Sequence, residues 1–162
     1  MKGSKNIISV VTIILSGMML LACDSESGQQ AASEPEIDPE VTRQVLDHHW
    51  KTFVANDLDG VMEDYTEESV LITPDSTYRG LDAIRGNFVS AFQAFPSNSS
   101  TLTLQKSVVE RDVGYILWEA STKQFDLIFA TDTFIVQDGK ILRQTYGGIT
   151  AQEAAAKSTP DN

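Results

Sequence analysis

Apolar positions along this chain follow helical spacing in the first half and strand-like alternation in the second. Three segments have apolar residues at helical spacing: residues 39–55, 58–65 and 81–95. Asp38 and Pro39 predict the start of the first helix, because Asp caps free N–H groups and Pro suits the first helical position. A short strand is expected at residues 70–73, ended by Pro74, and residues 75–80 are expected to form a polar loop.

The second half of the chain predicts a run of antiparallel strands. Four segments alternate or are rich in strand-forming residues: residues 101–110, 114–123, 127–137 and 140–150. Between the last two, Asp138–Gly139 predicts a tight hairpin, because Gly tolerates the positive φ that such a turn needs. Helices followed by strands indicate a single α+β domain over residues 39–150, with a bent antiparallel sheet wrapped on the helices. Residues 151–162 carry little apolar content and are expected to be disordered.

Composition narrows the function classes. The chain has 162 residues, so one domain is expected. Its formal net charge is -11, and repulsion of the phosphate backbone excludes nucleic-acid binding. The single cysteine, Cys23, rules out an internal disulfide. No Cys/His cluster has metal-site spacing, and the adjacent His48 and His49 would point in different directions on a helix. We therefore expect no metal and no organic cofactor.

The first 38 residues are interpreted as a targeting signal followed by a flexible tether. Lys2 and Lys5 precede an apolar run of fifteen residues, 7–21, which is shorter than the roughly 20 residues of a membrane span. The run ends in Leu-Leu-Ala-Cys, which resembles a bacterial lipobox, so residues 1–22 would be a signal peptide and Cys23 the lipidated residue. Residues 23–38 would then form a flexible tether in the periplasm. Asp24 after the cysteine resembles an inner-membrane retention signal of enteric bacteria.

Residues 39–149 resemble the nuclear-transport-factor-2-like (NTF2-like) superfamily, in particular its SnoaL-like and ketosteroid-isomerase-like members. The resemblance rests on three pieces: HHWKTFVANDLDGVMEDYTEESVLITPD, YRGLDAIRGNF and ATDTFIVQDGKI. It implies a cone-shaped domain with a bent sheet, a pocket at its wide end and homodimerisation through the outer sheet face. It does not name an activity, because this fold hosts several enzymes and plain binding modules.

The isomerase-like members suggest which residues line the pocket. Their general base, an Asp before the Pro that ends the first strand, is replaced by Thr73, which cannot act as a base near neutral pH. Their oxyanion-donating Tyr on the first helix corresponds to His49, and their second acid corresponds to Asp132. On the predicted strands, Trp118 and Tyr146 are further candidates for contact with a ligand; Trp118 could instead belong to the core or the dimer interface, and Tyr146 to the core.

Each candidate also has a purely structural interpretation. His49 lies within the apolar stripe of the first helix and is equally consistent with a hydrogen-bonded core histidine, whereas His48 should be solvated. Asp132 is consistent with a structural carboxylate, and either group should have a partner if buried. The run of acidic residues at 57–68 is expected to be a solvated face.

Two functional hypotheses follow. The first is an envelope-anchored lipoprotein whose pocket domain binds a small apolar or amphipathic molecule, or acts as a dimeric interaction module; the missing base at Thr73 motivates it. The alternative is a cofactor-independent proton-transfer enzyme, an isomerase, dehydratase or hydrolase, with His49 as acid or base and Asp132 as its partner.

Overall fold

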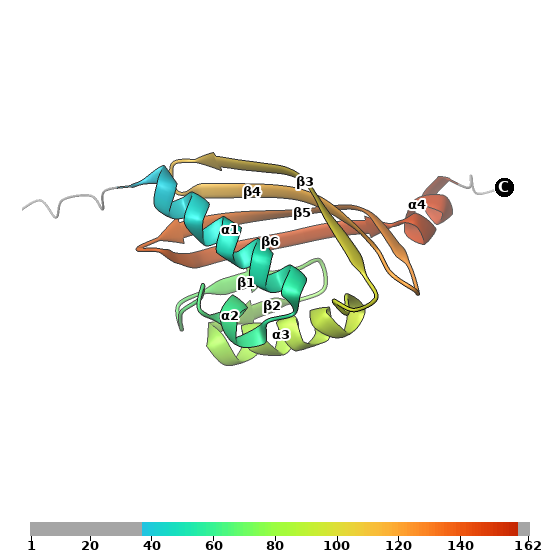
Figure 1. The fold of residues 1–162 in the computed structure, drawn as a ribbon, viewed down its shortest axis with the longest axis horizontal. Helices are drawn as coiled ribbons and strands as arrows, with labels where there is room; N and C mark the ends of the chain where they lie inside the picture. The colour runs from blue at the N-terminus through green and yellow to red at the C-terminus, as the bar shows by residue number, and fades with distance from the viewer. Residues whose placement is uncertain (1–36, 159–162) are drawn as a thin grey trace, which may run out of the picture. The chain divides into compact units, whose positions relative to one another are not determined.

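The computed structural model describes residues 37–158, so the predicted signal peptide, Cys23 and most of the tether lie outside the described residues. The elements run in this order (Figure 1): α1 (Pro39–Ala55), α2 (Leu58–Met62), β1 (Val70–Ile72), β2 (Thr77–Arg79), α3 (Gly80–Ala94), β3 (Thr101–Glu110), β4 (Val113–Ser121), β5 (Asp126–Gln137), β6 (Lys140–Thr150) and α4 (Ala151–Ser158). Within residues 37–158, no helix is long and apolar enough to cross a membrane.

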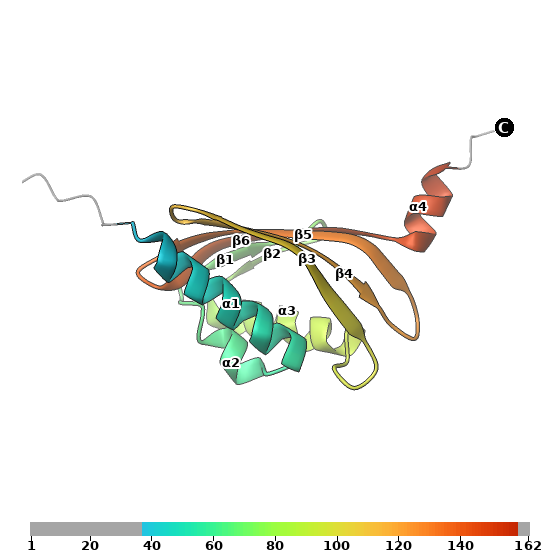
Figure 2. The ribbon, with the colours of Figure 1, turned by 45° about the horizontal axis from the view of Figure 1, so that its top comes forward.

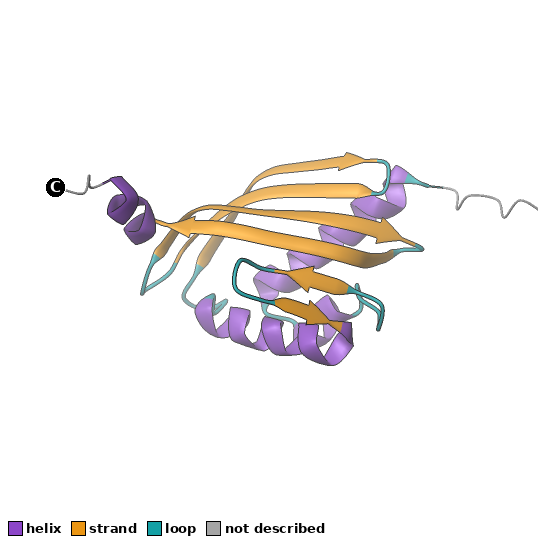
Figure 3. Cartoon of the chain, turned by 180° about the vertical axis from the view of Figure 1, so that it is seen from behind, coloured by secondary structure: helices purple, strands orange, loops and turns teal. Residues whose placement is uncertain are grey.

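The predicted α+β fold is confirmed. The six strands form one sheet in the order β2-β1-β6-β5-β4-β3, and helices α1 to α3 lie against one face of it (Figure 2). The opposite face is not covered by any described helix (Figure 3). All neighbouring strands are antiparallel except β1 and β6, which are parallel, so the sheet is mixed and not purely antiparallel as expected.

Two segments differ from the sequence prediction. Part of the expected loop at 75–80 forms β2, in which Tyr78 pairs with Leu71 of β1. Residues 151–158, expected to be disordered, form α4. The reason is a reciprocal capping box: Glu153 accepts from the Thr150 amide at 2.8 Å, and the Glu153 amide donates to Thr150 Oγ1 at 3.2 Å.

Register shifts occur in three neighbouring strand pairs of the sheet. They fall between Leu104 and Lys106 of β3, beside Trp118 in the pairing of β4 with β5, and between Leu127 and Phe129 of β5, so the extra residues lie in β3 and β5. An extra residue in a strand bends it and increases its twist. Because Trp118 pairs with Leu104 on one side and Ala130 on the other, two of these shifts lie directly beside this residue.

Helix α1 is fixed at both ends, to the β3–β4 turn at its N-terminal end and to the end of α3 at its C-terminal end. Asp38 caps the Glu40 amide at 2.9 Å, and Thr42 Oγ1 donates to the carbonyl of Arg111 at the β3–β4 turn at 2.9 Å. Asn56 ends the helix in the left-handed conformation, and its Nδ2 donates to the Phe95 carbonyl at 3.1 Å. These contacts hold the buried face of α1 over the strands that carry the site.

Gly114 provides the closest approach of α1 to the sheet. A Cβ added at this buried position of β4 would overlap the side chain of Leu46, which is itself 3% exposed and cannot move aside freely. We expect Gly114→Ala to lower the free energy of unfolding by about 1–3 kcal/mol through overpacking.

Gly86 in α3 is the matched control. A Cβ there meets nothing within 4 Å, so Gly86→Ala should raise the free energy of unfolding by about 0.5–1 kcal/mol through helix propensity. Urea unfolding of both variants measures the difference. Equal stability of the two variants would contradict this account of the α1–sheet contact.

Candidate functional site

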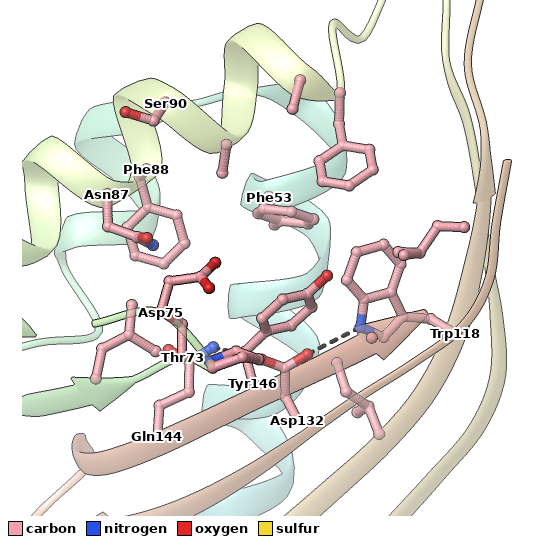
Figure 4. A pocket seen from close by; sticks show the side chains of 18 of the residues that line it. Phe53, Thr73, Asp75, Asn87, Phe88, Ser90, Trp118, Asp132, Gln144 and Tyr146 are labelled. Atoms are coloured by element: carbon pink, nitrogen blue, oxygen red, sulfur yellow. Dashed lines mark hydrogen bonds between the residues drawn. The ribbon is translucent and has the colours of Figure 1, made fainter. Parts of the chain in front are cut away.

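A cavity of about 510 Å³ lies between the helices and the inner face of the sheet. Figure 4 shows side chains from α1, α3, the β1–β2 loop and the long strands directed into it. Aromatic side chains form a large part of its wall: Trp50, Phe53, Tyr78, Phe88, Phe95, Trp118, Phe125 and Tyr146. The Trp118 ring is at the centre of this group, with ring centroids of Trp50, Phe53, Phe95 and Tyr146 between 5.7 and 6.2 Å away.

Asp132 is the buried carboxylate of the cavity and is 5% exposed. Its Oδ2 accepts from the indole Nε1 of Trp118 at 2.8 Å, and its Oδ1 accepts from Nε2 of Gln144 at 2.8 Å (Figure 4). Burial raises the pKa of Asp132 above its ordinary value, while the two donors and the nearby His49 oppose this. The period-two pattern of β5 therefore places a fully partnered acid on the inner face.

Gln144 extends this network to the helical side of the domain. Its Oε1 accepts a hydrogen bond from the Tyr65 hydroxyl, so the amide connects Tyr65 to Asp132. Burial raises the pKa of Tyr65 well above its ordinary value, with Asp132 and Asp64 adding to the effect. The Tyr65 phenol is thus a neutral donor.

His49 lies at the inner wall of the cavity and is 4% exposed. Its imidazole is surrounded by the rings of Phe53, Tyr65, Phe88 and Phe134, with centroids 5.1 to 6.5 Å away. Its Nδ1 is 3.3 Å from Oδ2 of Asp64. A carboxylate only accepts, so Nδ1 carries the proton at this contact.

Asp64 is the one member of the acidic run described above that the structure buries, with its side chain 6% exposed. The expectation of a solvated face is wrong for this residue. His48 is only half-solvated, because its Nδ1 is 2.7 Å from Asp64 Oδ1, so one carboxylate serves two consecutive histidines. The Asp64 carbonyl accepts from the Ile141 amide at 2.7 Å, and this contact with β6 draws the residue inward.

The cavity opens beside Tyr146, where two exposed carboxylates lie. Asp75 points into the cavity from the β1–β2 loop (Figure 4), and Glu153 reaches it from the first turn of α4. Partial burial raises the pKa of Tyr146 to about 12, with Asp132, Glu153 and Asp75 adding to the effect. The hydroxyl also lies close to Gly148, where an added Cβ would be 2.6 Å from it.

All four site residues suggested by the sequence line this one cavity: His49, Trp118, Asp132 and Tyr146. Thr73 is also at its wall, so the position of the missing base belongs to the cavity. Their roles in binding or catalysis stay predictions. His49 and Asp132 have different hydrogen-bond partners, since His49 binds Asp64 whereas Asp132 binds Trp118 and Gln144.

Sequence reasoning missed Gln144, Asp75, Glu153 and Asp64. Gln144 lies two residues before Tyr146, so alternation could have placed it on the same inner face. The T-A-Q-E sequence at 150–153 fits the capping-box pattern and could have predicted the helix start near the mouth of the cavity. Asp75 carried no such signal. Within residues 37–158, no group of three or more His, Cys, Asp or Glu side chains is arranged to hold a metal ion.

Residues 46–144, which include most of the cavity wall, match the SnoaL-like domain family. The chain belongs to this family. No curated protein matches the chain significantly. The family and the fold agree, because solved structures with the same architecture are NTF2-like and SnoaL-like proteins.

Three solved structures show how far this SnoaL-like chain resembles others. A proposed ketosteroid isomerase from Kribbella flavida has a TM-score of 0.61 at 16% identity, covering 78% of this chain and 86% of that one. A proposed polyketide cyclase from Sinorhizobium meliloti has a TM-score of 0.57 at 20% identity, covering 64% of this chain and 94% of that one. An NTF2-like protein of unknown function from Mesorhizobium loti has a TM-score of 0.61 at 21% identity, covering 71% of this chain and 96% of that one. At these identities the likeness concerns the fold.

Proposed function

We propose that this SnoaL-like domain binds a small apolar or amphipathic molecule in the cavity between its helices and its sheet. The observation that carries the proposal is the cavity itself, which has about 510 Å³, an aromatic wall and a few polar groups at defined positions. This is the usual make-up of small-molecule sites. The apolar part of a ligand would contact the rings around Trp118, and its polar part would reach Tyr146.

The state of the polar groups favours binding over catalysis. Both oxygens of Asp132 accept hydrogen bonds, and His49 is enclosed by four rings with Nδ1 held by Asp64. A proton-transfer site needs titratable groups that can reach a substrate. The expected base position is Thr73, which cannot supply that reactivity.

Intrinsic tryptophan fluorescence can test this proposal. The sequence has two tryptophans, Trp50 and Trp118, and both line the cavity. Intrinsic fluorescence therefore reports on the site alone. Titration with a graded series of phenylalkyl alcohols should shift and quench the emission with saturation, and affinity should rise with chain length until the cavity is filled. An emission spectrum that no member of the series changes would count against a ligand site.

Proton-transfer catalysis is the second candidate, because His49 and Asp132 line one cavity. In that reading His49 would use Nε2 as acid or base, with Nδ1 fixed by Asp64, and Asp132 would orient or donate. The test is turnover of small carbonyl or epoxide substrates by wild type and His49→Gln. Activity that survives the substitution, or a pH–rate profile without an ionisation in the histidine range, would exclude this assignment.

We further propose that the outer sheet face mediates homodimerisation. Val108 is 40% exposed, and its cross-strand partner Tyr115 pairs with Thr133, so these residues share the uncovered face (Figure 3). Val108→Asp should convert a dimer to a monomer in analytical ultracentrifugation, because two new charges would face each other. Val89→Asp, at a 41% exposed valine of α3, is the control. A wild-type protein that sediments as a monomer would refute the proposal.

Membrane attachment through Cys23 is a separate proposal that rests on the Leu-Leu-Ala-Cys sequence alone. The domain would then sample ligands in the periplasm of a bacterial envelope, with Asp24 directing it to the inner membrane. Mass spectrometry of the mature N-terminus should find a diacylated cysteine. Cys23→Ala should abolish that modification and leave the folded domain unchanged.

A further inference from the structure

We propose that the ligand of this cavity is a hydrophobic cation, such as an aromatic or alkyl amine carrying a quaternary or protonated nitrogen. The inference rests on the ligand-binding function proposed above and specifies the class of molecule. It combines two observations: the charge of the groups around the cavity and the aromatic chemistry of its wall.

The charged groups that line the cavity have one sign. They are the carboxylates Asp75, Asp132 and Glu153, and among residues 37–158 no Lys or Arg belongs to the wall. His49 is the basic side chain there, and its Nδ1 is bound to the Asp64 carboxylate. A ligand with a carboxylate or phosphate would therefore enter against a negative field with no cationic partner, which disfavours acids.

Asp75 is the carboxylate best placed to meet a cation. It is exposed at the mouth yet directed inward (Figure 4), and no hydrogen bond or ion pair within residues 37–158 engages its side chain. Glu153 differs, because its Oε2 accepts from Thr150 and Lys157 lies one helical turn further on. Asp132 differs as well, with both oxygens already accepting hydrogen bonds.

The aromatic wall supplies the second, independent feature. Trp50, Trp118 and Tyr146 form a connected set of rings, with centroid separations of 5.9 Å and 6.2 Å from Trp118. The faces of Trp and Tyr attract cations, and desolvation strengthens the attraction. An ammonium group held near Tyr146 would contact a π face and lie close to Asp75, while its apolar tail filled the inner cavity. This arrangement satisfies a cation and leaves an anion unpaired.

The experiment compares three probes of nearly equal size and different charge: 4-phenylbutyltrimethylammonium, 5-phenylpentan-1-ol and 5-phenylpentanoate. Binding to the full-length native chain is measured by tryptophan fluorescence and by calorimetry. We expect the ammonium to bind about tenfold more tightly than the alcohol, and the carboxylate more weakly than the alcohol. The preference for the ammonium should shrink in high salt.

Charge-removing variants locate the effect. Asp75→Asn should remove most of the preference for the ammonium over the alcohol. Glu153→Gln should have a smaller effect, because the Glu153 carboxylate already accepts two hydrogen bonds from Thr150; Gln also keeps the capping-box geometry of α4. The matched control is Asp47→Asn on the exposed face of α1, which makes the same change in net charge away from the cavity. It should leave all three affinities unchanged.

The outcomes separate this inference from the function on which it rests. Equal affinity for ammonium and alcohol, or tightest binding of the carboxylate, overturns the cation preference while the pocket function stands. An unchanged ammonium preference in both Asp75→Asn and Glu153→Gln also overturns it. If no probe binds, the proposed ligand-binding function fails, and the cation preference fails with it.

Discussion

Replacing Asp132 by Ala is expected to lower the free energy of unfolding by about 2–3 kcal/mol. The substitution removes the acceptor for both the Trp118 indole N–H and the Gln144 amide, and it leaves these donors in a buried, mostly aromatic environment. A buried donor without a partner carries most of its desolvation penalty. Urea unfolding followed by circular dichroism measures the loss. Asp126→Ala, at an exposed position of the same strand, should stay within about 0.5 kcal/mol of wild type.

The ionisation of Asp132 gives this prediction a pH dependence with a definite sign. Burial raises the pKa of the folded carboxyl above its unfolded value, so in the window between the two values the folded protein holds a proton that the unfolded chain has lost. Stability should therefore fall as the pH rises from about 4 through the raised pKa, and then stay level. Asp132→Asn should lack this component. A wild-type minus Asp132→Asn difference curve that is flat or rises over that range would contradict the raised pKa.

Replacing Asp64 by Ala is expected to be comparably severe, with a loss of about 2–3 kcal/mol. This carboxylate accepts from Nδ1 of both His48 and His49. Of the four aromatic neighbours of the His49 ring only Tyr65 carries a polar atom, and that hydroxyl is held by Gln144. His48 is half-exposed and can turn to water, so the penalty comes mainly from His49. Chemical denaturation measures it.

A spectroscopic readout separates the positioning of His49 from a general loss of stability. Long-range ¹⁵N–¹H spectra should show the proton of His49 on Nδ1 in wild type and a changed tautomer population in Asp64→Asn, since an amide both donates and accepts. Glu63→Gln is the control, because this exposed neighbour lies 4.0 Å from His48 Nε2 and should change stability by less than about 0.5 kcal/mol. If both variants leave the His49 signals unchanged, Asp64 does not set the tautomer.

The sequence predicted those parts of the structure that local chemistry decides. Asp138 and Gly139 adopt φ values of 51° and 71°, as the expected hairpin turn requires, and Asn56 ends α1 in the left-handed conformation where the helix was expected to end. Alternation along β5 placed Asp132 and Phe134 together on one face, and both are buried. Local spacing therefore sufficed for most elements and for placing these two β5 side chains on the same face.

The parts that could not be predicted depend on contacts between distant segments. Asp64 belongs to an acidic run and is buried because β6 docks against it through Ile141, a relation that no local pattern encodes. Asp75 faces the cavity because of the path of the β1–β2 loop, which depends on the pairing of β1 with β6. In contrast, α4 was encoded by the capping box at Thr150 and Glu153 and could have been found.

The parallel pairing of β1 with β6 has a consequence for how the domain assembles. Strands β3 to β6 are joined by short hairpins and can form from neighbours in sequence, whereas the short β1–β2 hairpin joins the sheet through Val70, Leu71 and Ile72 only after β6 exists, across more than half of the folded domain. Closing such a long loop is entropically costly, so this step should come late in folding. The same seam is short, with three residues paired on each strand, and local opening should begin there. Because it carries Asp75 and Thr73, the mouth of the cavity can loosen while the β3–β6 meander stays folded.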